Sequence, residues 1–327
     1  MKVLVTGSSG HLGEALMRTL PLAGHEPVGL DARPGAFTRH TGSICDMDLV
    51  RSTIRGADAV IHTATLHKPH VATHSWADFV DTNITGTRIL LQAAVEAGVG
   101  AFLFTSTTSA FGRALRPPAG APAAWIDEEV SGRVKNIYGA TKTAAEDLCE
   151  LTHGQTAMPV LVLRTSRFFP EEDDNPQVRA RYRPENAKAN EFLYRRVDLA
   201  DAASAHVCAL ERAGEIGFAK YIISATPPFD RDDVAGLRDD APPTVWSRFP
   251  SGKAIYESRG YEMFDSIDRV YSNARARREL GWEPEYDFAR ILRQLDAGDP
   301  IGSALAREVG VKGYHGDAFA DGLYPVA

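Results

Sequence analysis

The sequence predicts an α/β protein with a doubly wound parallel sheet and a smaller, irregular α/β region toward the C-terminus. Two observations predict this fold class. Strand-like segments alternate with helical segments over the first half of the chain, and each spacer is long enough for a crossover helix. After Arg164 the alternation gives way to polar, proline-containing stretches. We therefore expect a first domain over residues 1–165 that takes back about residues 198–224, interleaved with a smaller region over residues 166–327.

Each expected element has a local signal. Five short apolar runs predict strands, in the order KVLVT, EPVGLD, AVIHTA, AFLFTS and PVLVLR. Apolar residues at helical spacing predict helices over residues 12–25 and 75–98, and we expect Pro21 to kink or shorten the first. A helix at about residues 198–212 and a strand at YIIS are expected later. The charge-dense stretch 171–196 is typical of a solvated loop, or of a substrate-binding loop at the end of the sheet.

The composition favours a small molecule as the ligand. The 327 residues are 44% hydrophobic and carry a formal net charge of -7, whereas nucleic acid or an anionic membrane would call for a basic face. Cys45, Cys149 and Cys208 share no close spacing, which indicates neither a disulfide framework nor a zinc cluster and favours a reducing compartment. The sequence shows no secretory leader and no apolar run of ~20 residues, so we expect a cytoplasmic protein that binds neither nucleic acid nor membrane.

The segment VLVTGSSGHLG, residues 3–13, predicts a dinucleotide site. Its three glycines follow a strand and open a helix, where unpaired backbone N–H groups and the helix dipole can hold a pyrophosphate. We expect Gly7 to make the tight turn, Gly10 to admit a phosphate, and Gly13 to let the helix pack on the sheet. Asp31 closes the second strand, where a carboxylate binds ribose hydroxyls and disfavours a 2′-phosphate. This favours NAD, although the nearby Arg33 leaves NADP open.

A tyrosine and a lysine stand four residues apart at the start of a predicted helix. Tyr138 and Lys142 in NIYGATK therefore share one helix face. Beside an ammonium and a nicotinamide cation a tyrosine loses its proton more readily, and the phenolate can take a proton from a substrate hydroxyl as hydride leaves. Thr107 in FTSTTSAFG is placed to hydrogen-bond the same oxygen. An exposed Tyr and Lys pair without a chemical role is the alternative for an isolated match.

With these residues in place, the chain resembles the extended short-chain dehydrogenase/reductase superfamily, in particular its NAD-dependent epimerase/dehydratase branch. The matching segments follow the family's order along nearly the whole chain: TGSSGHLG, LDARP, VIHTAT, DTNITGT, FTSTTSAFG, YGATK, LRTSRF, RRVDLADAASAHVCAL and ARARRELGWEP. The resemblance implies a Rossmann-type sheet, NAD as cofactor, and Thr107, Tyr138 and Lys142 as the catalytic residues, with Lys142 also on the nicotinamide ribose. It implies further cofactor contacts from His11 and Leu12 in the phosphate turn, Ser43 and Ile44 near adenine, Ala64, Thr65 and His67 after the fourth strand, and Asn83 on the long helix.

Several polar residues also have a simpler interpretation. His62 is expected to be a packed core histidine, and His67 is either a cofactor contact or a surface loop residue. Asn83 is either near the cofactor or bonded to backbone groups of its own helix. The cluster HTATLHKPHVATH lacks a metal-ligand spacing, so we expect no metal.

The chain departs from the family's pattern at the substrate end. Family members that dehydrate nucleotide sugars carry Asp-Glu after the catalytic threonine, whereas this chain has Thr108, a candidate substrate contact, and Ser109, which disfavours dehydration. Many sugar epimerases have asparagine where this chain has Arg167, which could grip a substrate carboxylate or phosphate or else pair with an acidic residue at 171–174.

The segment from Arg167 to RRVDLAD is shorter than in typical nucleotide-sugar epimerases, which weakens the case for a UDP-sugar. Its basic residues are possible anchors for an anionic group or exposed charges: Lys188, Arg195 and Arg196.

These features predict an NAD-dependent enzyme acting on a carbohydrate-like secondary alcohol. A sugar or nucleotide-sugar epimerase that works through a keto intermediate is favoured. A dehydrogenase or reductase that releases its product needs the same three catalytic residues, and a non-catalytic NAD-binding sensor is a third hypothesis. The helices at 75–97 and from Tyr138 are apolar enough to pack against a second copy, and family relatives commonly dimerise through such helices, so we expect a homodimer.

Overall fold

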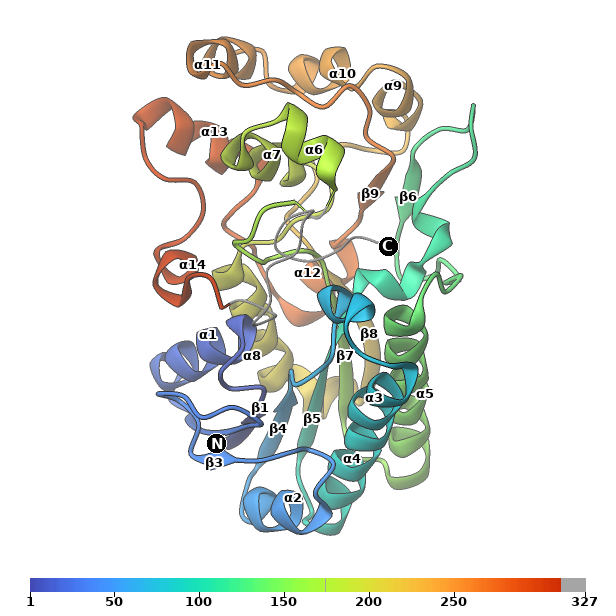
Figure 1. Cartoon of the computed structure of the whole chain (residues 1–327), viewed down its shortest axis with the longest axis vertical. Helices are drawn as coiled ribbons and strands as arrows, with labels where there is room; N and C mark the ends of the chain where they lie inside the picture. Colours follow the sequence, from blue (N-terminus) through green and yellow to red (C-terminus); the bar gives the residue numbers. More distant parts are fainter. Residues whose placement is uncertain (174, 313–327) are drawn as a thin grey trace.

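The computed structural model describes residues 1–173 and 175–312, and its centre is a seven-stranded parallel sheet (Figure 1). The strands lie in the order β3-β2-β1-β4-β5-β7-β8, which confirms the predicted doubly wound α/β class. Their bounds are β1 Lys2–Thr6, β2 Glu26–Asp31, β3 His40–Thr41, β4 Ala59–His62, β5 Ala101–Thr107, β7 Val160–Thr165 and β8 Phe218–Ile223.

Helices cover both faces of this sheet because successive side chains of each strand point to opposite faces. Val3 and Val5 of β1 pack in a core with α1 (His11–Thr19), α8 (Leu199–Ile216), α12 (Ala274–Leu280) and α14 (Ala304–Val309). Leu4, between them, packs in the other core with α2 (Met47–Ile54), α4 (Gly86–Glu96) and α5 (Ile137–Thr156). In Figure 1, α1 and α8 lie on one side of the strands, and α4 and α5 on the other.

The two long predicted helices are interrupted. The first ends at Thr19 and continues as a short 3-10 turn over Leu20–Ala23, with Pro21 at its start, as expected for a residue that cannot donate a helical hydrogen bond. The second consists of α3 (Trp76–Phe79), a π-helical segment over Val80–Thr85, and α4. Such π segments are frequent at functional sites, and this one contains Asn83.

The second region lies above the sheet in Figure 1 and has its own core. A two-stranded parallel sheet joins β6 (Ala124–Ile126) to β9 (Arg269–Tyr271), far apart in sequence. Neither strand was predicted, because three residues are too few for an alternating pattern. Part of the charge-dense stretch forms two helices instead of a loop. The region's helices are α6 (Pro176–Arg181), α7 (Pro184–Glu191), α9 (Val234–Asp239), α10 (Ala241–Arg248), α11 (Gly252–Arg259) and α13 (Phe288–Ala297).

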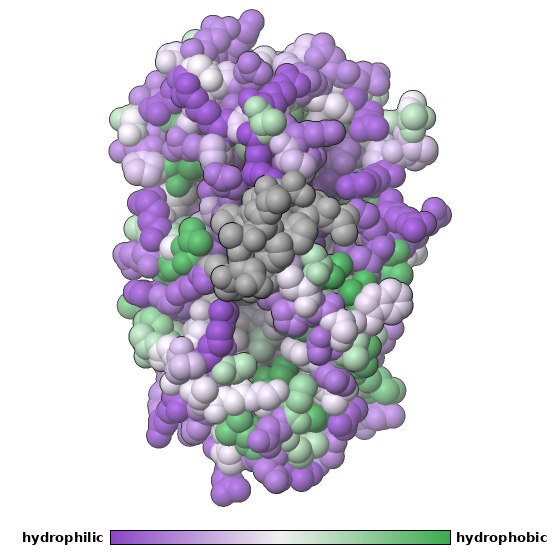
Figure 2. All heavy atoms as spheres, in the orientation of Figure 1, coloured by the Kyte–Doolittle hydropathy of each residue, from purple (hydrophilic) through white to green (hydrophobic). Residues whose placement is uncertain are grey.

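The outer surface is mostly polar on the face shown in Figure 2, where hydrophobic side chains occur in small groups. Among the helices of the described residues, none is both long enough and apolar enough to cross a bilayer.

Candidate active site

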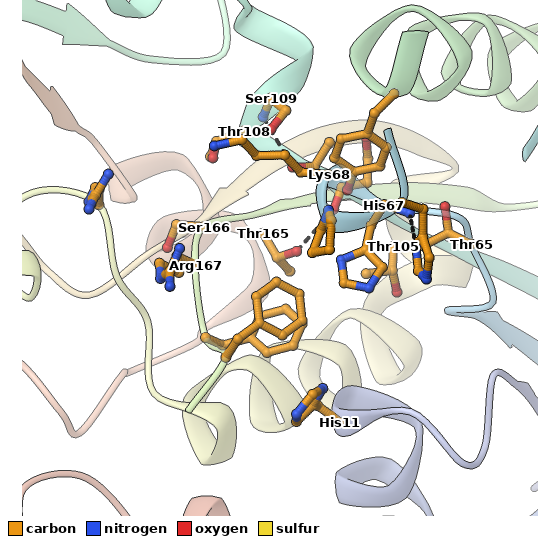
Figure 3. Close-up of a pocket in the computed structure, with 18 of the residues that line it drawn as sticks. His11, Thr65, His67, Lys68, Thr105, Thr108, Ser109, Thr165, Ser166 and Arg167 are labelled. Carbon is orange, nitrogen blue, oxygen red and sulfur yellow. Dashed lines mark hydrogen bonds between the residues drawn. The ribbon is translucent and has the colours of Figure 1, made fainter. Parts of the chain in front are cut away.

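One pocket of about 1390 Å³ lies at the carboxyl ends of the central strands, between the sheet and the second region. Ligands bind at this edge in open parallel α/β sheets because the loops after the strands converge there. The volume exceeds the 300–1,000 Å³ or so of a pocket for one drug-sized ligand, so the pocket can hold a cofactor and a substrate together. Figure 3 shows part of its lining.

The glycine turn forms one end of this pocket. Gly7 has φ of 76°, which favours glycine, and a Cβ there would lie 2.7 Å from the Ala64 nitrogen. A Cβ on Gly13 would lie 1.9 Å from the Gly7 carbonyl oxygen, so α1 could not pack so closely against the turn. Gly10 lines the pocket and is the N-cap of α1, so no N-cap side chain stands between the start of this helix and the pocket.

Asp31 lies beside this turn at the end of β2 and lines the pocket, as does Arg33. Its carboxylate accepts hydrogen bonds from the backbone nitrogens of Ser9 and Arg33, both at 2.9 Å. The acid therefore ties the loop after β2 to the glycine turn. Four other predicted cofactor residues line this part of the pocket: His11, Leu12, Ser43 and Ile44.

The loop after β4 forms the next part of the wall through Ala64, Thr65 and His67. The His67 ring stacks on Phe169, with ring centroids 5.2 Å apart. Asn83 is buried and does not appear among the lining residues. Its side chain accepts a hydrogen bond from the Leu66 nitrogen at 2.8 Å and donates to the Leu66 carbonyl at 2.9 Å. Asn83 thus holds the loop that carries Thr65.

The structure brings two of the three predicted catalytic residues to the pocket wall. Thr107 ends β5, and Tyr138 lies in the first turn of α5. Asn136 caps this helix by accepting a hydrogen bond from the Gly139 nitrogen at 3.0 Å. Burial raises the pKa of Tyr138 to about 12, and its hydrogen bond with Thr107 opposes this rise.

Lys142 lies one turn further along α5, behind the wall. It is 2% exposed and does not appear among the lining residues. Its Nζ donates to the Thr105 carbonyl at 2.7 Å and lies 3.9 Å from the centre of the Phe104 ring. Burial lowers the pKa of Lys142 to about 7, and the nearby Glu146 carboxylate opposes this. In the protein without cofactor, burial thus has the largest effect on both pKa values. The Tyr138 pKa is raised, whereas we expected Lys142 and the nicotinamide cation to lower it.

The predicted substrate residues divide into two groups. Thr108 and Arg167 line the pocket. Arg167 donates to the Glu172 carbonyl at 2.6 Å, and its Nε lies 3.7 Å from a carboxylate oxygen of Glu191, which is outside the expected acidic stretch 171–174.

Arg196 and Lys188 lie outside the lining residues. Arg196 donates to Glu191 at 2.7 Å and to the Phe169 carbonyl at 3.0 Å, and Lys188 donates to the Pro170 carbonyl. Both brace the loop that follows β7.

Several residues of the wall were missed in the sequence. The far end of the pocket is lined by Tyr182, Tyr194, Phe264, Arg269 and Tyr271. They come from segments with no shared local pattern, and only tertiary packing assembles them. Lys68 and Ser166 were also missed, although Ser166 lies two residues after the predicted strand PVLVLR, which is a usable signal.

His62 is a packed core histidine, as expected from the sequence. His62 is 1% exposed and lies between Thr6 and Thr87, with its ring nitrogens 2.7 and 3.0 Å from their hydroxyls. Within residues 1–173 and 175–312, no group of three or more His, Cys, Asp or Glu side chains is arranged to hold a metal ion.

A glycine turn in which Gly7 and Gly13 leave no room for a Cβ, set beside a Thr and Tyr pair at the carboxyl edge of a doubly wound sheet, is characteristic of dinucleotide-dependent enzymes. More narrowly, the chain belongs to the NAD dependent epimerase/dehydratase family, whose model matches residues 3–217. It is therefore an enzyme with NAD as its cofactor, as the resemblance implied.

The similarity to individual proteins of known activity or structure is low. The chain is 33% identical over 191 residues to a dTDP-glucose 4,6-dehydratase from Streptomyces niveus, covering 52% of this chain and 54% of that protein. It is 30% identical over 196 residues to a UDP-glucose 4-epimerase from Streptomyces lividans, covering 57% of this chain and 56% of that protein. The matches thus span about half the length of both relatives. A short-chain dehydrogenase/reductase superfamily protein from Agrobacterium tumefaciens, solved with bound NAD, has a TM-score of 0.65 and 24% identity over 94% of this chain and 97% of that one, which shows the same fold.

The residues present fit NAD. Gly7 and Gly13 have no room for a Cβ because other backbone atoms lie against them, so the turn is compact, and all three glycines of the turn line the pocket with their backbone. Asp31 stands at the same pocket edge, where a ribose would lie.

Proposed function

We propose that this enzyme oxidises a secondary alcohol of a carbohydrate-like substrate with NAD and then reduces the keto intermediate from its other face, as a sugar or nucleotide-sugar epimerase. The observation that carries this proposal is that Thr107 and Tyr138 lie together in the wall of the pocket that also contains the glycine turn, where Thr107 acts to lower the Tyr138 pKa. Family membership supports the cofactor. Both curated relatives described above are named for reactions of nucleotide sugars.

Tyr138 acts as the base in this proposal. Its phenolic oxygen takes the proton of the substrate hydroxyl while the carbon of that alcohol loses hydride, which leaves a ketone. Bound NAD supplies the hydride acceptor and a positively charged ring. Since burial alone raises the Tyr138 pKa to about 12, the protein needs positive charge nearby to make the phenolate accessible.

Lys142 supplies part of that charge. Its pKa of about 7 keeps roughly half of the ammonium charged at neutral pH. It lies on the same helix face as Tyr138, one turn away. We infer that Lys142 also contacts the nicotinamide ribose from behind Tyr138, and that Thr107 orients the substrate hydroxyl toward the tyrosine oxygen.

The residues after Thr107 argue against dehydration. Loss of water needs an acid and a base beside the reacting carbons, and this chain places Thr108 and Ser109 in the lining at that point. Neither hydroxyl titrates near neutral pH. The same pocket therefore favours reversible hydride transfer.

Identification of the released nucleotide tests the proposal. Freshly purified protein is denatured, and the nucleotide that it releases is identified by chromatography and absorbance. Near-stoichiometric NAD supports an epimerase, because an epimerase returns its hydride in each cycle and can keep its cofactor. Sugar isomerisation without added NAD should then be measurable and should disappear in Tyr138→Phe. An empty site together with NADH formation from sugars and added NAD would support a product-releasing dehydrogenase instead, and bound NAD without any turnover would support a sensor.

We further propose a homodimer in the cytoplasm. Large apolar side chains are exposed along the expected helical contact: Trp76 is 74% exposed, Val80 40% and Leu151 on α5 53%. The three cysteines are free thiols, as a reducing compartment allows. Light scattering at micromolar concentration should give twice the chain mass, and a monomeric mass would contradict the dimer.

A further inference from the structure

We propose that the substrate carries an anionic group, a carboxylate or a phosphate monoester, close to the reacting alcohol, and that Ser166, Arg195 and Lys68 bind this group. This inference rests on the proposed hydride-transfer function and specifies its substrate class. It concerns the pocket wall next to Thr107, and the three residues come from three separate segments of the chain.

The position of Ser166 is set by strand pairing. Thr165 at the end of β7 is the register partner of Thr107 on β5, and neighbouring strands lie about 4.8 Å apart. Ser166 is the next residue, and its backbone nitrogen is held by the Ile223 carbonyl at 2.9 Å. A group bound by Ser166 is therefore attached within a few bonds of the alcohol that reacts beside Thr107.

The Ser166 hydroxyl lies in the pocket wall without a hydrogen-bond partner among the described residues. The residue is only 3% exposed. A buried hydroxyl without a partner costs free energy and calls for an explanation. A substrate oxygen in the pocket supplies one.

Arg195 brings a fixed positive charge to the same wall. The backbone hydrogen bond from Arg167 to the Arg195 carbonyl, at 3.1 Å, holds this residue beside the end of β7. Its Nη2 is anchored by Asp173 and by Glu191, the latter at 2.5 Å. Its buried Nε has no partner among the described residues, although the residue lines the pocket. The guanidinium is thus oriented in advance and keeps an N–H for a ligand.

Lys68 contributes a cation from a different element. It begins the 3-10 turn Lys68–Ala72 after β4 and lines the pocket. Burial lowers its pKa to about 8, and repulsion from Arg167, Arg195 and Lys135 adds to this. All four of these cations line the same pocket, so an anion bound there would be attracted by each of them. Asp173, which also lines the pocket, acts on the Lys68 pKa in the opposite direction and raises it.

The side chains after Thr107 are neutral. Thr108 and Ser109 would not repel an anion, whereas an acidic pair at these positions would. In the view of Figure 3, Thr108, Ser109 and Lys68 lie along one side of the pocket, and Ser166 and Arg167 lie along another. The space between them combines hydroxyl donors with positive charge, which is the combination that oxyanions require.

A matched set of sugars tests this inference with the full-length, NAD-saturated protein. D-Glucuronate and D-galacturonate test a carboxylate, glucose 6-phosphate and galactose 6-phosphate test a phosphate, and glucose, galactose and their UDP derivatives are the comparisons. We measure isomer formation, NADH absorbance and calorimetric binding. We expect one anionic series to exceed its uncharged counterpart at least tenfold in kcat/KM. The better series identifies the anion.

The variants Ser166→Ala and Lys68→Met should each reduce this preference about tenfold through KM, with little change for the uncharged sugars. Lys253→Met is the matched control, because Lys253 on α11 is exposed and does not line the pocket. Equal use of charged and uncharged sugars, or a preference for UDP-sugars that Lys68→Met leaves unchanged, would overturn the inference while leaving the proposed function intact. Binding of anionic sugars that Lys68→Met weakens, without any turnover, would support the anion site and contradict the proposed reaction.

Discussion

The glycine turn allows cofactor binding and folding to be separated by two single substitutions. At Gly10, φ is -79° and an added Cβ would meet only the Gly7 carbonyl oxygen, at 3.2 Å. At Gly13, the added Cβ would lie 1.9 Å from the same oxygen and 2.6 Å from its carbon, and both atoms are backbone. Alanine is therefore tolerated by the fold at the first position and excluded at the second.

The expected magnitudes differ accordingly. Gly13→Ala forces α1 away from the turn, and overpacking of this kind costs about 1–3 kcal/mol or more. Gly10→Ala should change the free energy of unfolding by less than about 0.5 kcal/mol. Its methyl group, however, would take up pocket space where we propose that a phosphate of NAD binds. We expect the NAD dissociation constant to rise at least tenfold.

Thermal unfolding without nucleotide and calorimetric titration with NAD measure the two effects. Gly154→Ala is the control, because its Cβ would meet nothing within 4 Å on α5, and alanine in a helix adds up to about 1 kcal/mol of stability. Wild-type NAD affinity in Gly10→Ala, or wild-type stability in Gly13→Ala, would refute the assigned roles of these glycines.

Three further predictions follow from buried polar groups. Arg164→Met leaves the fully buried Glu146 carboxylate without its 2.7 Å partner and should destabilise the fold by about 3–5 kcal/mol in chemical unfolding. Arg51→Met removes an exposed ion pair and should change stability far less; equal costs would contradict the burial argument. Asn83→Ala removes the ties to Leu66 and should lower stability by about 1–3 kcal/mol and weaken NAD binding; unchanged affinity would remove Asn83 from cofactor positioning. Lys68 is charged below its pKa of about 8, so the preference for anionic sugars should fall as the pH rises through 8. In Lys68→Met this preference should not change over the same pH range. A preference that rises with pH would contradict the role of Lys68.

The sheet and the cofactor end of the pocket were predictable because their signals are local. The apolar runs, the glycine spacing and Asp31 each fall within a few residues of one strand end, and parallel strands bring such ends together. The Thr107 and Tyr138 pair could be predicted for the same reason, since both residues lie at the ends of elements with clear patterns.

The substrate end could not be predicted as well. Arg196 and Lys188 carry the charge expected of an anion site, but tertiary packing uses them to hold the loop after β7. Ser166 and Lys68 lie in the pocket because of strand register and loop conformation, neither of which leaves a periodic pattern. The placement of Lys142 against the Thr105 carbonyl likewise depends on how α5 docks on β5.

Tyr138→Phe in the NAD-loaded protein tests the central claim most directly. The phenyl ring keeps the packing of Tyr138, which is 8% exposed, and removes only the hydroxyl that moves the proton. We expect NAD to bind with an affinity within about threefold of wild type, and turnover of the best sugar to fall by 10² to 10⁴, roughly the contribution of a general base. Unchanged turnover with NAD bound would show that Tyr138 is not the base and would contradict the proposed mechanism.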